Sequence, residues 1–284
     1  MPSPFTDIIE TSELASHLED PDWLIFDCRF NLANPSWGEK EYFRSHIPGA
    51  IYAHLDRHLS GPVTSHTGRH PLPEPKKFVE QLSAWGVDSH KQVVVYDSLS
   101  GEFAARLWWL LNYYGHSQVA VLNGGFTKWE AEGHPTRSGD EENRPSTFIP
   151  TLHPEMLVTT QEIERLYQDP EFLVIDARAP ARFAGREEPI DPVAGHIPGA
   201  VNRFHGNNLS PSGTILSPEE LRQEFRHLIG HRNSRNVIVY CGSGVTSCHH
   251  VLAMHLAGIG FPRLYAGSWS EWIRDPSHPV DRED

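Results

Sequence analysis

Short apolar runs recur along the whole chain, separated by stretches with helical spacing of their apolar residues. The runs are rich in valine, isoleucine and leucine, which is typical of strands buried on both faces of a parallel sheet. Strands alternating with helices predict an α/β fold of the doubly wound kind, a parallel sheet flanked by helices. The runs are LIF (24–26), VVVY (93–96), VAVL (119–122), FLVI (172–175), VIVY (237–240) and RLYA (263–266).

Helix starts are marked by capping residues. Thr159 with Glu162 forms the pattern of a capping box before IERLYQ, and Ser217-Pro218 followed by Glu220 has the same pattern with a first-turn proline. Pro75 opens KKFVEQLSAW, and Gly86 stands where that helix would end. These signals predict three of the helices between the apolar runs.

The same set of landmarks occurs twice in the same order, and such self-similarity indicates a duplicated domain. We predict a first domain over 1–137, a linker over 138–156 rich in Pro, Ser and acidic residues, and a second domain over 157–284. Within the linker, Phe148, Ile149 and Leu152 are expected to lie along a domain surface. The landmarks are LIFDCRF (24–30), HIPGAIY (46–52), VVVYDS (93–98), NGGFTKW (123–129) and GHP (133–135), then LVIDARA (173–179), HIPGAVN (196–202), VIVYCG (237–242), AGSWSEW (266–272) and SHP (277–279).

The most informative stretch is VIVYCGSGVTSC (237–248), in which a buried strand runs into a cysteine and a glycine-containing loop before a helix. Gly242 and Gly244 can take positive φ, which turns the following backbone amides inward. Those amides and the helix N-terminus would cradle an anion and lower the pKa of the Cys241 thiol. The alternative, a buried core cysteine, does not explain the Gly-Ser-Gly that follows.

Composition narrows the class of protein. The chain has 284 residues and a formal charge of −13, which argues against a nucleic-acid partner or an anionic membrane surface. Its three cysteines form no disulfide framework, and the sequence has neither a signal-peptide pattern nor an apolar run of membrane-spanning length. We therefore expect a cytoplasmic protein with reduced thiols.

The repeated D-x-R after a strand, the repeated H-I-P-G-A and the loop CGSGVT resemble the rhodanese superfamily over nearly the whole chain. The resemblance implies a tandem-domain sulfurtransferase with two rhodanese-like domains. Its loop resembles that of 3-mercaptopyruvate sulfurtransferases, whereas thiosulfate sulfurtransferases carry basic residues where Gly242 and Ser243 stand. Asp97 occupies the position of Cys241 in the first repeat, which implies a catalytically silent N-terminal domain.

The resemblance also implies the chemistry. Cys241 takes a sulfane sulfur from a small anionic donor as a persulfide and passes it to a thiol acceptor, such as a small dithiol or a thioredoxin-like protein, or to cyanide. We expect 3-mercaptopyruvate as the donor, with thiosulfate as the alternative, and no metal or organic cofactor. The loop that holds the sulfur consists of Gly242, Ser243, Gly244, Val245, Thr246 and Ser247.

Other site residues follow from the resemblance position by position. Arg182 matches an arginine that binds the donor's anionic group, although a structural role is the alternative. A second family arginine falls on Ile190, with Arg186 the nearest basic residue. His70 matches a histidine that works with Ser243 in proton transfer, against a plain surface role.

The acid of that proton-transfer set falls on Gly61, so a Ser-His-Asp relay is not predicted. We hypothesise that Arg69, beside His70, supplies positive charge instead. Cys248 is expected to be a packed helix residue, with a resolving thiol as the alternative. The repeated His46 and His196 and the repeated pairs Asp27–Arg29 and Asp176–Arg178 are read as scaffold. Trp129 and Trp272 are read as core or interface residues, and Cys28 as buried and inert. A metal site at Cys248-His249-His250 is disfavoured by its spacing.

Two rival functions use the same kind of loop. A cysteine-dependent phosphatase needs an arginine six residues after the cysteine, where this chain has Ser247. A persulfide carrier would relay sulfur from Cys241 to a partner protein without turning over a small donor, and fast multiple turnover distinguishes the enzyme from the carrier.

Overall fold

The computed structural model describes residues 4–99 and 101–283, which form two compact units. The first unit runs to Gly61 and adds Pro73–His153 and Leu209–Ile215. The second comprises Pro62–Leu72, Pro154–Asn208 and the chain from Leu216 onward. The sequence predicted a simple division of the chain at a linker over 138–156. The two units depart from that division in two short segments: residues 62–72 belong to the second unit, and residues 209–215 belong to the first.

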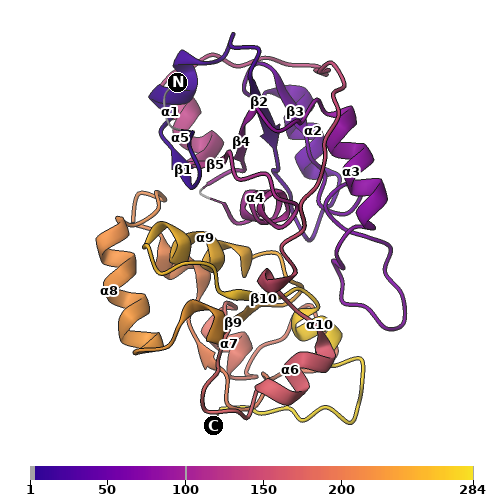
Figure 1. Ribbon diagram of the computed structural model, residues 1–284, viewed down its shortest axis with the longest axis vertical. Coiled ribbons are helices and arrows are strands. Elements are labelled where there is room, and N and C mark those ends of the chain that lie inside the picture. The colour runs from indigo at the N-terminus through magenta and orange to yellow at the C-terminus, as the bar shows by residue number, and fades with distance from the viewer. Residues whose placement is uncertain (1–3, 100, 284) are drawn as a thin grey trace. The chain divides into compact units, whose positions relative to one another are not determined.

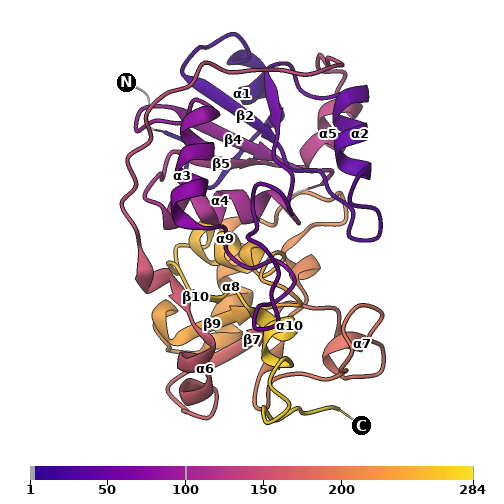
Figure 2. The same cartoon turned by 90° about the vertical axis from the view of Figure 1, so that its right-hand side faces the viewer.

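The first unit is a five-stranded sheet of order β1-β5-β4-β2-β3, and every neighbouring pair is parallel. Figure 2 shows α3 on one side of this sheet and α2 and α5 on the other. Its elements are β1 (Ile8–Ile9), α1 (Thr11–Ser16), β2 (Trp23–Asp27), α2 (Trp37–Arg44), β3 (Ala50–Tyr52), α3 (Pro75–Ala84), β4 (Gln92–Tyr96), α4 (Ala104–Tyr113), β5 (Val119–Leu122) and α5 (Gly125–Ala131) (Figure 1).

The second unit repeats this topology, with order β6-β10-β9-β7-β8 and parallel pairing throughout. The duplication and the α/β fold predicted from the sequence are thus confirmed. Its elements are η1 (Pro154–Met156), β6 (Leu157–Val158), α6 (Thr160–Leu166), β7 (Leu173–Asp176), α7 (Pro180–Phe183), β8 (Val201–Asn202), η2 (His205–Asn208), α8 (Pro218–Ile229), η3 (Ser234–Asn236), β9 (Val237–Tyr240), α9 (Cys248–Leu256), β10 (Arg263–Tyr265) and α10 (Ser268–Trp272).

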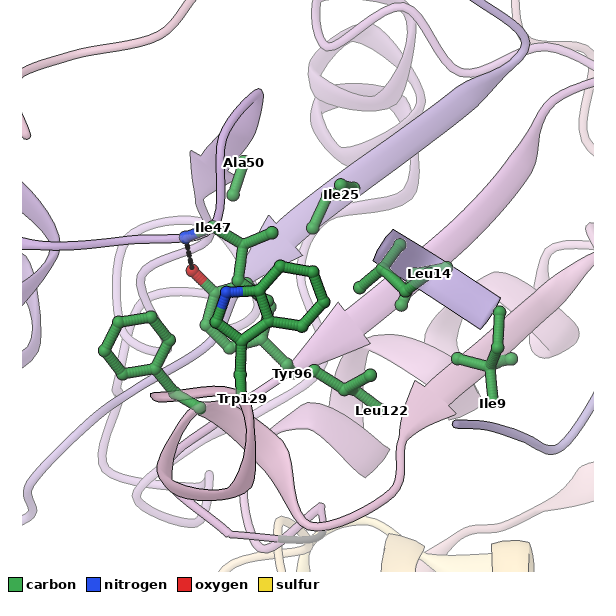
Figure 3. Packing of buried hydrophobic residues seen from close by; sticks show 11 residues of the cluster. Ile9, Leu14, Ile25, Ile47, Ala50, Tyr96, Leu122 and Trp129 are labelled. Atoms are coloured by element: carbon green, nitrogen blue, oxygen red, sulfur yellow. Dashed lines mark hydrogen bonds between the residues drawn. The ribbon is translucent and has the colours of Figure 1, made fainter. Parts of the chain in front are cut away.

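Alternate residues of each strand face opposite layers of helices. On one face of the first sheet, side chains of β2, β4 and β5 pack with Leu14 of α1 and Trp129 of α5 (Figure 3). The Tyr96 hydroxyl on this face accepts the Ile47 amide at 3.2 Å. The second unit repeats the contact between Tyr240 and the Ile197 amide, also at 3.2 Å.

Helix ends follow the signals read from the sequence. Both capping boxes form, at Thr159–Glu162 before α6 and at Ser217–Glu220 before α8. Each stabilises its helix by about 1 kcal/mol. Pro75 is the first residue of α3, and Gly86 follows that helix with φ +88°.

The two repeated motifs are physically linked in each unit. Arg29 forms a buried ion pair with Asp27 at 2.6 Å and donates to the Ser45 carbonyl, which directly precedes the HIPGA segment. Arg178 pairs with Asp176 at 2.7 Å and donates to the Gly195 carbonyl in the same way. The D-x-R pair therefore anchors the H-I-P-G-A loop to the end of a strand, which is the scaffold role expected of both.

The histidines and tryptophans of the repeats are also structural. His46 Nδ1 bonds the Tyr42 carbonyl and His196 Nδ1 bonds the Phe183 carbonyl, each at 2.8 Å. Trp129 and Trp272 are fully buried. The positions confirm the expectation that these residues brace and fill each unit.

The linker lies along the surface of the first unit, where the amides of Ser146 and Thr151 donate to the carbonyls of Ser83 and Tyr114, each at 2.9 Å. Phe148 is buried and lies against the His116 ring, whereas Ile149 is 81% exposed and Leu152 is 48% exposed. The segment thus follows a domain surface as expected, with one of its three apolar side chains buried and the other two turned outward. None of the helices in the described part of the chain has the length and apolarity needed to cross a bilayer.

Candidate active site

Cys241 lies where the sequence predicted, directly after β9, and the loop that follows it ends at α9. Its backbone amide donates to Ser268 Oγ at 3.1 Å, and its carbonyl accepts the Trp269 amide at 3.0 Å. The start of α10 therefore fixes the backbone of the cysteine. The residue is buried, with 2% of its surface exposed to solvent.

The two glycines of the loop are required for different reasons. Gly244 has φ +76°, and a Cβ atom there would lie 2.2 Å from the Ala266 carbonyl oxygen. Gly242 is not among the glycines with positive φ, so that expectation was wrong for this residue. Instead, a Cβ atom on Gly242 would lie 2.8 Å from Nη2 of Arg69. The absent side chain leaves room for a guanidinium group to approach the loop.

The loop favours the thiolate form of Cys241. Burial raises the pKa of the thiol, but hydrogen bonds to the sulfur lower it by more, so the pKa lies below that of an ordinary thiol. The donors are the Ser247 and Thr246 hydroxyls and the backbone amides of Ser243 and Ser247. The two hydroxyls were not anticipated, because the sequence argument relied on backbone amides alone.

A comparison within the chain supports this assignment. The pKa of Cys28 is raised well above its ordinary value by burial and by the charges of Asp27 and Asp97. Cys28 and Cys241 are equally buried, each with 2% exposure, so burial does not account for the lowered pKa of Cys241.

The corresponding loop of the first unit already holds an anion. Asp97 follows β4 as Cys241 follows β9, and its carboxylate accepts four backbone amides at 2.7–3.1 Å, from Leu99, Gly101, Phe103 and Ala104. A strand–loop–helix of this kind therefore binds a negative charge through its backbone. In the first repeat the chain's own carboxylate fills the cradle.

His70 lies beside the Cys241 loop, as the sequence predicted. Its Nδ1 is 2.7 Å from Ser243 Oγ, and the histidine is buried. The segment Pro62–Leu72 that carries it belongs to the second unit, although it lies between strands of the first in the sequence. The proposed nucleophile and the histidine thus share one compact unit.

The short helix α10 holds this segment in place. Ser270 Oγ accepts the Arg69 amide at 3.0 Å, and a Glu271 carboxylate oxygen accepts the Gly68 amide at 3.2 Å. The Arg274 guanidinium donates to the Thr67 carbonyl at 3.1 Å. Because α10 also bonds the backbone of the cysteine loop, one element aligns both halves of the site.

Two arginines reach the loop. Besides Arg69, both Nη atoms of Arg182 lie 3.6 Å from the position that a Cβ atom would take on Gly242. Ile190 and Arg186, the positions considered for a second arginine, are both exposed. The second guanidinium beside the loop is that of Arg69, which comes from a segment far away in the sequence.

Comparison with known proteins settles the family. A model of the rhodanese-like domain matches residues 10–132 and 159–275. The chain belongs to the rhodanese-like domain family. Its two matches cover the two sequence repeats, so the tandem rhodanese architecture expected from the motifs is confirmed.

Relatives over the full length are sulfurtransferases. The chain is 46% identical over 275 residues to a probable 3-mercaptopyruvate sulfurtransferase of Pseudomonas aeruginosa, covering 96% of this chain and 97% of that one. It is 34% identical to the thiosulfate sulfurtransferase of Rattus norvegicus, covering 94% and 92%. The structure of a 3-mercaptopyruvate sulfurtransferase from Leishmania major superimposes with a TM-score of 0.83 at 33% identity, covering 96% and 75%. The sulfurtransferase function predicted from the sequence is thereby confirmed at the level of the enzyme class.

Cys248, the third thiol of this rhodanese chain, is the first residue of α9, and its side chain is packed in the protein interior. It is fully buried, and its S–H donates to the Gly244 carbonyl at 3.4 Å. The neighbouring His249 and His250 both bond the Asn208 side chain, at 2.8 and 3.0 Å. These contacts agree with the packed role expected for Cys248.

Ser270→Ala tests whether α10 positions the rhodanese site. Loss of the partly buried hydrogen bond from the Arg69 amide, of about 1 kcal/mol, should loosen the Arg69–His70 segment and lower kcat/KM for sulfur transfer about fivefold. Steady-state kinetics measures the change. Ser277→Ala, at an exposed serine that bonds only Asp275 among the described contacts, is the control. Equal kcat/KM in the two variants would contradict the positioning role.

Proposed function

We propose that the chain transfers sulfur from 3-mercaptopyruvate to a thiol or to cyanide through a persulfide on Cys241. The observation that carries the proposal is the placement of Cys241, which is buried directly after β9 in a loop whose Ser243 bonds His70 and whose donors lower the pKa of the thiol. The same donors would stabilise the terminal sulfur anion of a persulfide, which carries its charge one atom further out.

The first half-reaction moves one sulfur atom and one proton. The Cys241 thiolate attacks the donor's sulfur, an S–S bond forms, and the donor's C–S bond breaks. The electron pair of the broken C–S bond stays with the donor's carbon fragment, which becomes the enolate of pyruvate. The proton from the donor's thiol is then delivered to the enolate carbon that carried the sulfur. His70 and Ser243, 2.7 Å apart, lie where they can carry it.

The second half-reaction restores the enzyme. An acceptor thiolate or cyanide attacks the outer sulfur, the S–S bond breaks, and Cys241 leaves as the thiolate. Two half-reactions through a covalent intermediate give ping-pong kinetics. A small dithiol or a thioredoxin-like protein is the proposed acceptor.

The proposed donor follows from the two arginines beside the loop. The loop itself carries no basic residue, but Arg69 and Arg182 approach it at Gly242. Arginine binds carboxylate oxygens with a fixed pair of donors, which suits an α-keto acid. The 46% identity to a probable 3-mercaptopyruvate sulfurtransferase supports the same choice. Thiosulfate is the second candidate, supported by the 34% identity to a thiosulfate sulfurtransferase.

Side-by-side measurement of kcat/KM for the two donors, with dithiothreitol or cyanide as acceptor, tests the donor. We expect the larger value with 3-mercaptopyruvate. A clear preference for thiosulfate would overturn the donor, and persulfide formation without multiple turnover would favour a carrier. A cytoplasmic location, which would keep the three free thiols reduced, is part of the proposal and is tested by cell fractionation.

Arg182→Ala should lower kcat/KM for 3-mercaptopyruvate at least about tenfold, because a charge-assisted contact contributes roughly 1.5–3 kcal/mol. Arg182→Lys should recover only part of the loss, since lysine lacks the paired donors. Arg186→Ala removes an exposed arginine from the same segment and should leave kcat/KM unchanged. Parity of Arg182→Ala with the parent enzyme would refute donor binding by Arg182.

A further inference from the structure

Asp191 connects the two arginines that approach the cysteine loop. One of its carboxylate oxygens accepts Nη1 of Arg69, and the other accepts Nη2 of Arg182 at 3.1 Å. The carboxylate is almost inaccessible to solvent, with 3% side-chain exposure. A buried carboxylate that binds a different guanidinium with each oxygen fixes the distance between them.

Glu188 lies on the same segment as Asp191 but bonds a different set of residues. It accepts two bonds from Arg182, at 2.7 and 3.2 Å, and one from Arg178 at 3.3 Å. Its partners all lie within the stretch 178–191, where it also accepts the Asp191 amide at 3.0 Å. Glu188 therefore fixes Arg182 locally, whereas Asp191 joins it to Arg69 of the segment 62–72.

The two guanidinium groups converge on one spot of the loop. Nη2 of Arg69 and both Nη atoms of Arg182 lie within 3.6 Å of the position a Cβ atom would take on Gly242. Two like charges at such separation repel each other. The Asp191 carboxylate offsets this repulsion and keeps both groups beside the residue that follows the nucleophile.

The charges of this cluster balance. Arg178 pairs with Asp176 as well as Glu188, and Arg182 and Arg69 face Glu188 and Asp191. Three arginines thus meet three carboxylates. Such a site offers directed N–H donors without a large excess of positive charge, which suits a donor with one negative charge better than a dianion.

We propose that Asp191 is a positioning and specificity-determining residue, which holds Arg69 and Arg182 side by side so that they bind the single carboxylate of the donor and discriminate against the dianion thiosulfate. The inference rests on the proposed function, because it assumes donor binding at these arginines. It concerns a residue that does not itself contact the donor.

The test is the ratio of kcat/KM for 3-mercaptopyruvate to kcat/KM for thiosulfate in Asp191→Asn. Removing the negative charge loosens the arginine pair and leaves the site more positive. The ratio should fall at least tenfold, chiefly through a higher KM for 3-mercaptopyruvate, while thiosulfate turnover is kept or improved. Asp191→Glu, which keeps the charge, should have a ratio between those of Asp191→Asn and the wild type.

Glu187→Gln is the matched control, because it removes one negative charge from an exposed residue of the same segment. Its ratio should equal that of the wild type. An Asp191→Asn ratio equal to wild type, including a parallel loss with both donors, would overturn the inference. A wild-type preference for thiosulfate would instead overturn the proposed donor, so the two failures are distinguishable.

A measurement on the wild-type protein guards against an Asp191→Asn variant that does not fold. At constant ionic strength, pyruvate, a carboxylate monoanion, should compete with 3-mercaptopyruvate at lower concentration than sulfate, a dianion. Sulfate competing as well as or better than pyruvate would overturn the discrimination that we assign to Asp191.

Discussion

Replacing Cys241 with serine should abolish sulfur transfer, with turnover falling by at least about a thousandfold. A serine hydroxyl is not ionised at neutral pH and cannot carry the sulfur as a persulfide. Intact-protein mass spectrometry after incubation with donor should find the mass of one added sulfur on the parent enzyme and none on the variant.

Cys248→Ser is the matched control for this loss. Cys248 lies seven residues further along the chain and is fully buried, with its S–H on the Gly244 carbonyl. The control should retain turnover and the added sulfur. Residual turnover in Cys241→Ser near that of Cys248→Ser would remove Cys241 from the proposed role, and loss of turnover in Cys248→Ser would revive the resolving-thiol alternative.

Gly244→Ala should be the most damaging single substitution in the loop backbone. A non-glycine residue at φ +76° costs roughly 1–2 kcal/mol, and the new Cβ atom would meet the Ala266 carbonyl oxygen at 2.2 Å. We expect a loss of about 2–4 kcal/mol in the free energy of unfolding together with a fall in kcat. Urea denaturation and steady-state kinetics measure the two effects.

Gly133→Ala separates conformational strain from overlap. Gly133 has a closely similar φ of +74°, but no atom lies within 4 Å of the position of its Cβ. In Gly133→Ala the backbone strain alone should lower the free energy of unfolding, by about 1 kcal/mol, and kcat should be unchanged. Equal stabilities and equal kcat for the two variants would show that the close approach of Ala266 does not shape the loop.

Much of the fold could be predicted because the determining signals are local. The apolar runs, the capping boxes at Thr159 and Ser217 and the proline at the start of α3 all act within a few residues, and each forms as expected. The repeat of landmarks fixed the duplication, since both copies use an Asp–Arg pair to anchor the HIPGA loop.

From the residues alone, the site could be predicted only where one segment holds it. The position of Cys241 follows from a strand, a glycine-containing loop and a helix, whereas His70 and Arg69 were expected only through the family resemblance. Asp191 was missed, because its contacts with Arg69 and Arg182 join two segments that no spacing in the sequence relates. The placement of 62–72 in the second unit was missed for the same reason.

The two repeats also show that the same kind of loop can hold two different chemical groups. In the first, the Asp97 carboxylate accepts the backbone amides of the loop, so the chain itself supplies the anion. In the second, a thiol stands at the equivalent position, with hydroxyls of Thr246 and Ser247 among its donors. The exchange of aspartate for cysteine accounts for a single reactive domain in the proposed function.

The central claim is that the loop after β9 makes Cys241 acidic enough to act as a thiolate. The most direct measurement is the rate of alkylation of Cys241 by iodoacetamide as a function of pH, in a protein whose Cys28 and Cys248 are replaced by serine. Because the pKa is lowered in the folded state, the half-maximal rate should fall at a lower pH than about 8.5, the value of an ordinary thiol. The same protein unfolded in urea should give that ordinary value. Coincident pH profiles for the folded and unfolded protein would contradict the claim.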